Sequence, residues 1–304
     1  MAYIRRKLID LHTQKIPAYK VLMNALNLSI SHAQRLIDKK RLFCQNELVK
    51  SKNEHLSGLV ELIEYENKPR GVKIIFEDNE FAVLLKPSGV LSHPNGRHCE
   101  YSLCDEIWHL WGMKACVAHR LDKGTSGLIL VAKNEKTQII LKNAFLNKEV
   151  EKEYLALVKG ETKPEFKADF PLNLALNYDD VKMRMCVDFE KGKEALSHFE
   201  RLFHDKNLNL SFIKCVPKTG RQHQLRVHLH ALNHTILGDN LYGLKKEQIE
   251  SILDEKLSKS ELISLTGASR LLLHASCLKF KFKGKKFKFV DEKGVKEEFL
   301  ASLK

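Results

Sequence analysis

The sequence predicts an α+β protein in which a small basic N-terminal module precedes a larger domain. Strand-like and helix-like segments are interspersed without the regular alternation of a doubly wound sheet. A proline and a glycine interrupt regular structure in ENKPRG, residues 66–71, and mark a linker. The 304 residues are 43% hydrophobic, which suffices for two medium domains or for one large core with a small satellite.

The chain is strongly basic, with a formal net charge of +13. Residues 1–70 carry 13 Lys and Arg against 7 Asp and Glu, so the basic density is highest there. Such an excess favours a polyanionic partner: RNA, DNA or an anionic membrane. Because no apolar run approaches the length of a membrane span or forms a signal peptide, we expect a cytoplasmic protein with no membrane partner. Nothing in the sequence demands more than a monomer.

Within the N-terminal module, residues 29–41 predict a short amphipathic helix. Ala33, Leu36 and Ile37 fall at helical spacing, and Ser29 or Ser31 can cap the start. Four cations gather at its outer face and C-terminal end: Arg35, Lys39, Lys40 and Arg41. RLFCQNELVK then predicts a hairpin with a tight turn at residues 45–47, and residues 60–65 predict a closing strand.

This order of elements resembles a known RNA-binding module. The helix pair, SxAQRLI at residues 31–37, the turn at residues 45–47 and VELIEYE at residues 60–66 are similar to the S-four type module, first recognised in a small-subunit ribosomal protein. The resemblance implies an RNA-binding domain over residues 1–66 with its core at about 16–65, whose four cations contact phosphates. A basic solvated helix on an ordinary small domain explains the charge equally well.

The larger domain, residues 71–304, is predicted to be rich in strands. Residues 72–85 indicate a hairpin turning at residues 77–79, and the apolar run LILVA, residues 128–132, predicts a buried strand. Residues 152–160 indicate another strand, with Tyr154 and Ala156 on one face. Further on, the chain is expected to form a helical insertion at about 245–269 and a two-faced Lys/Phe hairpin at residues 279–289.

Two stretches carry unusual polar groups. HRLDKGTSGLILVAKN, residues 119–134, places charged side chains beside a buried strand, which is costly unless the charges are used. In TGRQHQLRVHLHALNHTILGDNLYG, residues 219–243, a helix is predicted at residues 222–232, with Asn233 in a left-handed cap position. Arg226 then lies near the N-terminal end of a helix whose apolar face packs inward.

Other chemistries fit these stretches less well. A metal site would draw on His223, His228, His230 and Asp239, but His228 and His230 are about 200° apart on a helix and cannot share one ion. The serines lack a GxSxG context, and no phosphate-binding glycine loop is present. The cysteines form no CxxC pair, so reduced thiols are expected; they stand at positions 44, 99, 104, 116, 186, 215 and 277.

The larger domain resembles the RluA-type RNA pseudouridine synthases. The resemblance covers nearly all of residues 71–304 and rests on five elements in order: KPSGVLSHP, HRLDKGTSGLILVAKN, KEYLALV, TGRQHQLRVHL with ILGDNLYG, and LLLHASCL. It implies the pseudouridine synthase catalytic fold, α+β with a mixed, mainly antiparallel central sheet. It also implies isomerisation of uridine to pseudouridine in RNA, with no cofactor and no metal.

Asp122 matches the catalytic aspartate of that family, and the chemistry requires it as a charged carboxylate. Whether it attacks the sugar, attacks the ring or removes a sugar proton stays open. Arg226 matches the basic residue that pairs with this aspartate; an arginine stays charged when buried and can hold a carboxylate in a fork. Tyr154 matches the tyrosine whose ring can stack on an extruded uracil.

The remaining assignments concern RNA contacts. Arg120 could fill the place of a flipped uridine or grip a phosphate. Lys86, Lys123 and Arg221 are expected to contact backbone phosphates, whereas His119 is read as a hydrogen-bonded structural residue. Leu273 either lines the uracil pocket or packs in the core.

The coupling of an S-four type module to this domain resembles the ribosomal-RNA branch of the family. The resemblance therefore implies RNA as the partner, namely large-subunit ribosomal RNA or a pre-ribosomal particle. Transfer RNA is the alternative substrate. A non-catalytic RNA-binding or ribosome-assembly factor is the alternative from another functional class.

Overall fold

The structure is a computed structural model that describes residues 3–66, 68–94, 101–175, 184–254 and 256–303. Its contacts divide the chain into two compact units. The first consists of Met1–Pro69 and Pro94–Asp105, and the second of Arg70–His93 and Glu106–Lys304. Within the described residues, no helix is long and apolar enough to span a bilayer.

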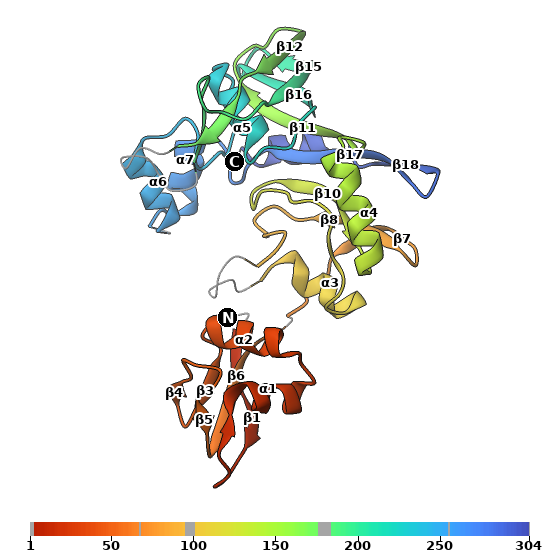
Figure 1. Ribbon diagram of the computed structural model, residues 1–304. Helices are drawn as coiled ribbons and strands as arrows, with labels where there is room; N and C mark the ends of the chain where they lie inside the picture. The colour runs from red at the N-terminus through yellow and green to blue at the C-terminus, as the bar shows by residue number, and fades with distance from the viewer. Residues whose placement is uncertain (1–2, 67, 95–100, 176–183, 255, 304) are drawn as a thin grey trace. The chain divides into compact units, whose positions relative to one another are not determined.

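The first unit is a small sheet packed on two helices. Its elements in chain order are β1 (Tyr3–Asp10), β2 (Ile16–Pro17), α1 (Ala18–Leu26), α2 (Ile30–Asp38), β3 (Leu42–Cys44), β4 (Glu47–Leu48), β5 (His55–Leu56) and β6 (Leu59–Tyr65). The main sheet has the order β1-β6-β3-β4 (Figure 1). Its core includes Leu22 of α1, Ile37 of α2 and Leu42 of β3, all buried.

The predicted elements of this unit are confirmed. The helix α2 is capped by Ser29, whose hydroxyl accepts a hydrogen bond from the His32 backbone. Gln45 and Asn46 both have positive φ, as a two-residue hairpin turn requires. The strand β1 was not predicted; it pairs antiparallel with β6, and the paired residues are 49 to 62 positions apart in the chain.

The second unit is built on a large mixed sheet. The strands of this unit are β7 (Lys73–Glu77), β8 (Phe81–Lys86), β9 (Cys116–Val117), β10 (Ser126–Ala132), β11 (Glu151–Lys159), β12 (Glu165–Asp169), β13 (Leu172–Leu174), β14 (Met185–Val187), β15 (Leu196–Asp205), β16 (Leu210–Pro217), β17 (Leu273–Phe282) and β18 (Lys285–Val290). Of these, β13 and β14 pair in a separate two-stranded sheet. The order across the sheet is β12-β15-β16-β11-β17-β10-β8-β7, with β18 on β17 and β9 on β10. Among the strand pairs of the described residues, β10 and β17 run parallel and the others antiparallel. The predicted mixed, mainly antiparallel sheet is therefore confirmed.

The helices lie around this sheet. They are α3 (Leu103–Trp111), which begins in the last residues of the first unit, α4 (Glu135–Leu146), α5 (Gln224–Ala231), α6 (Lys246–Leu253), α7 (Lys259–Thr266) and α8 (Val295–Ala301). The segment predicted as a helical insertion, at about 245–269, contains two short helices, α6 and α7. Cys99 lies outside the described residues.

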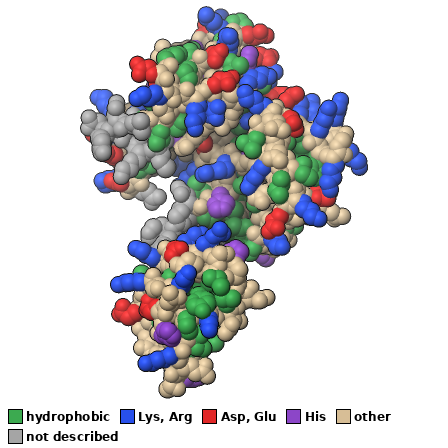
Figure 2. Space-filling view, viewed as in Figure 1, with side chains coloured by type: hydrophobic (Ala, Val, Ile, Leu, Met, Phe, Trp, Pro, Cys, Tyr) green, Lys and Arg blue, Asp and Glu red, His purple; other side chains and the backbone are tan. Residues whose placement is uncertain are grey.

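Two apolar clusters support the sheet. One packs strands β11 and β16 against α5 and α8, with Ile213 and Phe299 fully buried. The other packs β8, β10 and the β17–β18 hairpin against α4, with Phe81 at its centre. The hairpin is two-faced as predicted: Phe280 and Phe287 stack in this core, whereas Lys281 and Lys286 are exposed. The lysine side chains at its tip are among those coloured blue in Figure 2.

Candidate active site

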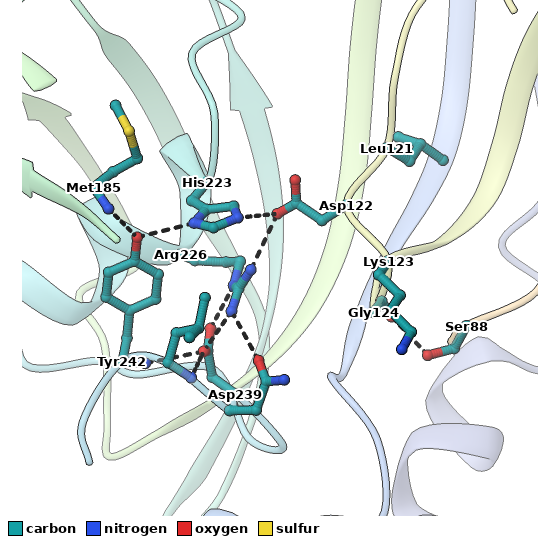
Figure 3. A network of polar contacts seen from close by, with 12 residues as sticks. Ser88, Leu121, Asp122, Lys123, Gly124, Met185, His223, Arg226, Asp239 and Tyr242 are labelled. Atoms are coloured by element: carbon teal, nitrogen blue, oxygen red, sulfur yellow. Dashed lines mark hydrogen bonds and ion pairs between the residues drawn. The ribbon is translucent and has the colours of Figure 1, made fainter. Parts of the chain in front are cut away.

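The loop that carries Asp122 runs from β9 to β10 and is held by backbone and serine contacts. Ser92 accepts from the backbone N–H of Leu121 at 3.1 Å and donates to the carbonyl of Leu121 at 2.8 Å. Ser88 donates to the carbonyl of Gly124 at 2.6 Å (Figure 3). The Asp122 carbonyl accepts from Thr125 N at 3.1 Å, which closes the turn. These contacts hold Asp122 at the start of the buried strand β10.

Close backbone approach explains the glycine that follows this loop. Gly127 has φ +113°, and a Cβ there would lie 2.3 Å from the carbonyl oxygen of Ala275. Gly127 and Ala275 are paired where β10 and β17 run parallel, so only glycine permits this approach. The position of the Asp122 loop therefore depends on a residue without a side chain.

Lys86, at the end of β8, lies beneath the same loop and is fully buried. Its ammonium donates to three backbone carbonyls: Val90 at 2.7 Å, Pro87 at 2.9 Å and Lys123 at 3.2 Å. Burial lowers the pKa of Lys86 to about 7, although the charge of Asp122 opposes the shift. The expectation that Lys86 contacts an RNA phosphate is therefore wrong, because the ammonium is enclosed and its donors are occupied.

Arg226 lies on α5 and contacts Asp122. Its Nη1 is 3.3 Å from Oδ2 of Asp122, as implied by the match of both residues to the family motif (Figure 3). The fork of the guanidinium, however, does not face Asp122. Nε and Nη2 bind the two carboxylate oxygens of Asp239, each at 2.7 Å. The expected fork is thus formed with a different aspartate, and Asp122 takes the remaining nitrogen.

Asp239 is itself fixed by its own turn. Its Oδ1 accepts from the backbone N–H groups of Leu241 at 2.9 Å and Tyr242 at 3.1 Å. The preceding Gly238 has φ +73°, and a Cβ there would collide with the carbonyl of Arg270. The turn in GDNLYG therefore holds the Asp239 carboxylate in the position in which it binds Arg226. This role of Asp239 was not predicted from the sequence.

The carboxylates of Asp239 and Asp122 keep the guanidinium of Arg226 charged although it is buried. Its side chain is 5% exposed, and that of Asp239 is 1% exposed. Burial alone would lower the pKa of Arg226, but the charge and hydrogen bonds of Asp239, followed by the charge of Asp122, raise it above its ordinary value. The site therefore holds a permanent cation next to Asp122.

His223 and Tyr242 complete the network, and neither was predicted to take part in it. His223 precedes α5 with a φ of +54°, so its ring turns back toward Asp122, with Nε2 3.9 Å from Oδ2. The Tyr242 oxygen accepts from the Met185 N–H at 3.1 Å and lies 3.1 Å from His223 Nδ1. Since burial raises the pKa of Tyr242, its hydroxyl stays protonated and is able to donate to Nδ1. In that arrangement the His223 proton is on Nε2, facing Asp122.

Tyr154 lies on β11, opposite Ala275 of β17 and Cys215 of β16. Burial raises the pKa of the Tyr154 phenol, and the negative charge of Asp122 raises it further. The phenol therefore remains neutral, and the ring lies within the electrostatic reach of the carboxylate. The structure thus places Arg226 against Asp122, and Tyr154 within the electrostatic reach of the same carboxylate.

Comparison with known proteins identifies the family. The RNA pseudouridylate synthase family matches residues 80–231, half of the chain. A Helicobacter pylori (strain ATCC 700392 / 26695) protein described as an uncharacterized RNA pseudouridine synthase is 36% identical over 282 residues, 92% of this chain and 91% of that protein. The chain belongs to the RNA pseudouridine synthases. It is an isomerase with an RNA substrate, and its domain is of the RluA type.

Two further comparisons support this pseudouridine synthase assignment. The ribosomal large subunit pseudouridine synthase D of Borreliella burgdorferi is 34% identical over 215 residues, 67% of this chain and 64% of that protein. A solved human protein, RNA Pseudouridylate Synthase Domain Containing 1, superposes with a TM-score of 0.57 at 22% identity. That superposition covers 75% of this chain and 86% of the human one. The human structure supports the pseudouridine synthase fold.

Around the network of this pseudouridine synthase, the other predicted residues differ in exposure. Arg120 and Lys123 are exposed, and neither side chain has a hydrogen bond or ion pair with the described residues. Arg221 is exposed and donates through Nε to the Glu194 carbonyl at 3.0 Å. Leu273 is 3% exposed and packs in the core cluster of β11 and β16.

The prediction for His119 is confirmed. Its Nε2 accepts from the Leu130 N–H at 3.2 Å, and its ring stacks on Phe145 at 4.6 Å. Burial lowers the pKa of His119 to about 3, so the ring is neutral. His119 is therefore a structural residue that ties the loop to β10.

The two histidines of α5, His228 and His230, each bind different polar groups of the protein. His228 contacts the Ser197 hydroxyl and the Phe170 carbonyl, each at 3.0 Å, whereas His230 contacts Thr235 at 3.0 Å. Within the described residues, no group of three or more His, Cys, Asp or Glu side chains is placed to hold a metal ion.

In the first unit, the four predicted RNA-contacting cations lie at the C-terminal half of α2 and directly after it. Arg35, Lys39 and Lys40 are exposed, and Arg41 is partly buried. Lys40 has a φ of +55°, which ends the helix and turns the chain into β3. The cations therefore form one local group on this unit.

Proposed function

We propose that this enzyme isomerises uridines of large-subunit ribosomal RNA, with Asp122 as the catalytic carboxylate. The observation that carries the proposal is the contact between Asp122 and the buried guanidinium of Arg226. The chemistry needs an ionised carboxylate in a site shielded from water, and a fixed neighbouring cation stabilises that form. Asp122 remains 24% exposed at its side chain, so substrate can reach it.

The orientation of the carboxylate supports this role. The Arg226 and His223 contacts both go to Oδ2, and in Figure 3 the other oxygen of Asp122 points away from them. Oδ1 is then the oxygen that meets the ribosyl or uracil group. In the net reaction the N1–C1′ bond breaks and a C5–C1′ bond forms, while the proton leaves C5 and N1 gains one. Asp122 can serve that exchange as nucleophile or as base.

The neighbouring residues would place the uridine. The ring of Tyr154 is proposed to stack on the extruded uracil, which is worth about 1 to 3 kcal/mol per base. Arg120, exposed two residues before Asp122, is proposed to take the place of the flipped base or to bind a phosphate. Lys123 and Arg221 are proposed as phosphate contacts, and Leu273 as part of the pocket wall.

The N-terminal unit is proposed to be an S-four type RNA-binding domain, residues 1–66, that joins a catalytic domain at residues 71–304. Its helix pair, its hairpin with the turn at Gln45 and Asn46, and the closing strand β6 support that assignment. The α2 cations would bind RNA phosphates. A cytoplasmic monomer remains our prediction for the whole protein.

The substrate assignment is tested by mapping pseudouridine in all cellular RNA with and without the gene. Loss of one or more sites in large-subunit ribosomal RNA is expected, and restoration by wild type but not by Asp122→Asn. Loss confined to transfer RNA would move the proposal to the alternative substrate. If Asp122→Asn restored the modification, the catalytic assignment would be overturned.

A further inference from the structure

Lys152 is a partly buried cation that the proposed chemistry does not use. It lies on β11, two residues before Tyr154, and by the alternation of a strand it shares the face of Tyr154. Within the described residues its ammonium has no hydrogen bond and no ion pair. Burial lowers the pKa of Lys152, and no anion offsets the shift.

The surroundings of the ammonium place it at the edge of the site. Its Nζ is 5.9 Å from the ring centroid of Phe145 on α4, and its charge helps to lower the pKa of His119, after the larger effect of burial. On the other side, a Cβ at Gly220 would lie 3.5 Å from Nζ. The ammonium therefore lies between the Asp122 loop and the loop that precedes α5.

Two other lysines of the same sheet are neutralised by glutamates. Lys279 of β17 pairs with Glu153 and lies 3.9 Å from Glu151, the two neighbours of Lys152 in sequence. Lys214 of β16 pairs with Glu200. The two glutamates next to Lys152 thus serve a lysine on the opposite face. A partly desolvated ammonium whose one described contact is an aromatic ring, and which has no anionic partner, is costly in the free protein, which is typical of a residue kept for a ligand.

We infer that Lys152 binds a phosphate of the RNA backbone beside the uridine held by Tyr154. The inference rests on the proposed function of Tyr154 and Asp122. Side chains at two positions on one strand face emerge roughly 7 Å apart, so one nucleotide can contact both. An ammonium is a compact point charge suited to a phosphate, and the Lys152 side chain is only partly buried, so a phosphate can reach it.

The test measures RNA binding apart from catalysis. The affinity of the full chain for a 20-nucleotide RNA stem-loop with a uridine loop is measured by fluorescence anisotropy across a range of KCl concentrations. Lys152→Met should weaken binding by about tenfold and reduce the slope of log affinity against log salt by roughly 0.7 to 0.9. The matched control is Lys159→Met, an exposed lysine at the other end of β11, which should change neither quantity.

A second measurement separates a phosphate contact from a structural role. Because Lys152 is desolvated without an anionic partner, and methionine can keep the apolar contact with Phe145, Lys152→Met should melt at the wild-type temperature or above it. Single methylphosphonate linkages, which remove one phosphate charge, are placed in turn on each side of every loop uridine. One position should weaken wild-type binding and leave binding by Lys152→Met unchanged.

The outcomes distinguish the two proposals. A salt slope equal to that of Lys159→Met, or additive losses at every methylphosphonate position, overturns the Lys152 assignment. A lower melting temperature with an unchanged slope also overturns it and makes Lys152 a packing residue. If Asp122→Asn remains active while the Lys152 effects persist, the catalytic proposal fails and the phosphate contact stands.

Discussion

Arg226 and Asp239 form a two-point ion pair, with both N···O distances at 2.7 Å, whereas Arg226 reaches Asp122 through one contact of 3.3 Å. The tighter pair with Asp239 therefore fixes the position of the guanidinium. Its remaining nitrogen, Nη1, faces Asp122. Because Asp239 shares the positive charge of Arg226, that charge does not fully neutralise Asp122. Asp239 acts here as a positioning residue, since it touches Arg226 and not the proposed substrate site.

Replacing Asp239 with asparagine should leave Arg226 buried without its main counter-charge. Breaking a buried pair on one side costs about 3 to 5 kcal/mol, so the melting temperature should fall clearly. A misplacement of about 1 Å can cost about 100-fold in rate, and we expect a loss of that order in single-turnover isomerisation. RNA affinity should change little, because Asp239 is 2% exposed.

The control for this prediction is Asn240→Ala. It removes the 3.3 Å contact between Arg226 Nη2 and the Asn240 side chain but keeps the carboxylate fork. Both stability and rate should remain close to wild type. A fully active Asp239→Asn protein would show that the fork does not position Arg226 for the reaction.

The contrast between Asp122 and Asp239 illustrates what the sequence can reveal. Asp122 stands out because charges next to the apolar run LILVA are costly, and that signal is local. The role of Asp239 depends on the left-handed backbone at Gly238 and on the packing of α5 beside it. The spacing of residues in the sequence does not indicate either feature. The GDNLYG stretch offered one usable signal: an aspartate after a glycine, followed by apolar residues and a tyrosine.

Lys86 and β1 show two further limits of sequence reasoning. A lysine is ordinarily exposed, so a lysine in a turn such as KPSG is assigned to the surface. Its burial is possible only because three carbonyls from two loops converge on it, which is a tertiary fact. Likewise β1 has a mixed pattern, YIRRKLID, and only its pairing with the distant β6 defines it. Local elements such as α2 and the β7–β8 hairpin needed no such information.

Tyr242 should set the protonation of His223. Burial, the largest cause, lowers the pKa of His223 below 6.5, and the tyrosine hydroxyl that donates to Nδ1 favours the same neutral ring. Because the folded pKa is below the unfolded one, this arrangement is intact at neutral pH and costs stability as the pH falls below about 6.5. In Tyr242→Phe the donor is gone, so we expect the pKa of His223 to rise. Nitrogen-15 NMR titration of the histidine rings measures it.

The matched control for that titration is His119, whose pKa burial lowers to about 3 and which makes no contact with Tyr242. Its ring should stay neutral across the same pH range in both proteins. A wild-type His223 midpoint at or above 6.5, or a midpoint that falls in Tyr242→Phe, would contradict the proposed donor and acceptor roles.

Lys86 should make stability depend on pH above neutrality. Its pKa is about 7 in the folded protein, against about 10.4 in an unfolded chain. Between these values the unfolded state binds more protons, so the free energy of unfolding rises with pH from about 7 to about 10 and is lowest below 7. Urea unfolding of wild type and Lys86→Met at several pH values isolates this effect. The variant should be less stable at every pH, because three carbonyls lose their donor, and the difference in the free energy of unfolding should widen as the pH rises. A difference that stays constant with pH would contradict the buried, pH-dependent role of Lys86.

The last prediction concerns the four cations in the C-terminal half of α2 and directly after it. If Arg35, Lys39, Lys40 and Arg41 bind phosphates, replacing all four with glutamine should weaken binding of a long ribosomal RNA fragment. It should also reduce the slope of log affinity against log salt by roughly 0.7 to 0.9 for each lost contact. Turnover of a short hairpin that engages only the second unit should persist, because Asp122, Arg226 and Tyr154 all lie in that unit. The comparison variant changes Lys7, Lys15, Lys20 and Lys52 of the same unit to glutamine, which removes an equal charge away from α2. Equal losses in the two variants would mean that net charge, and not the α2 surface, attracts the RNA.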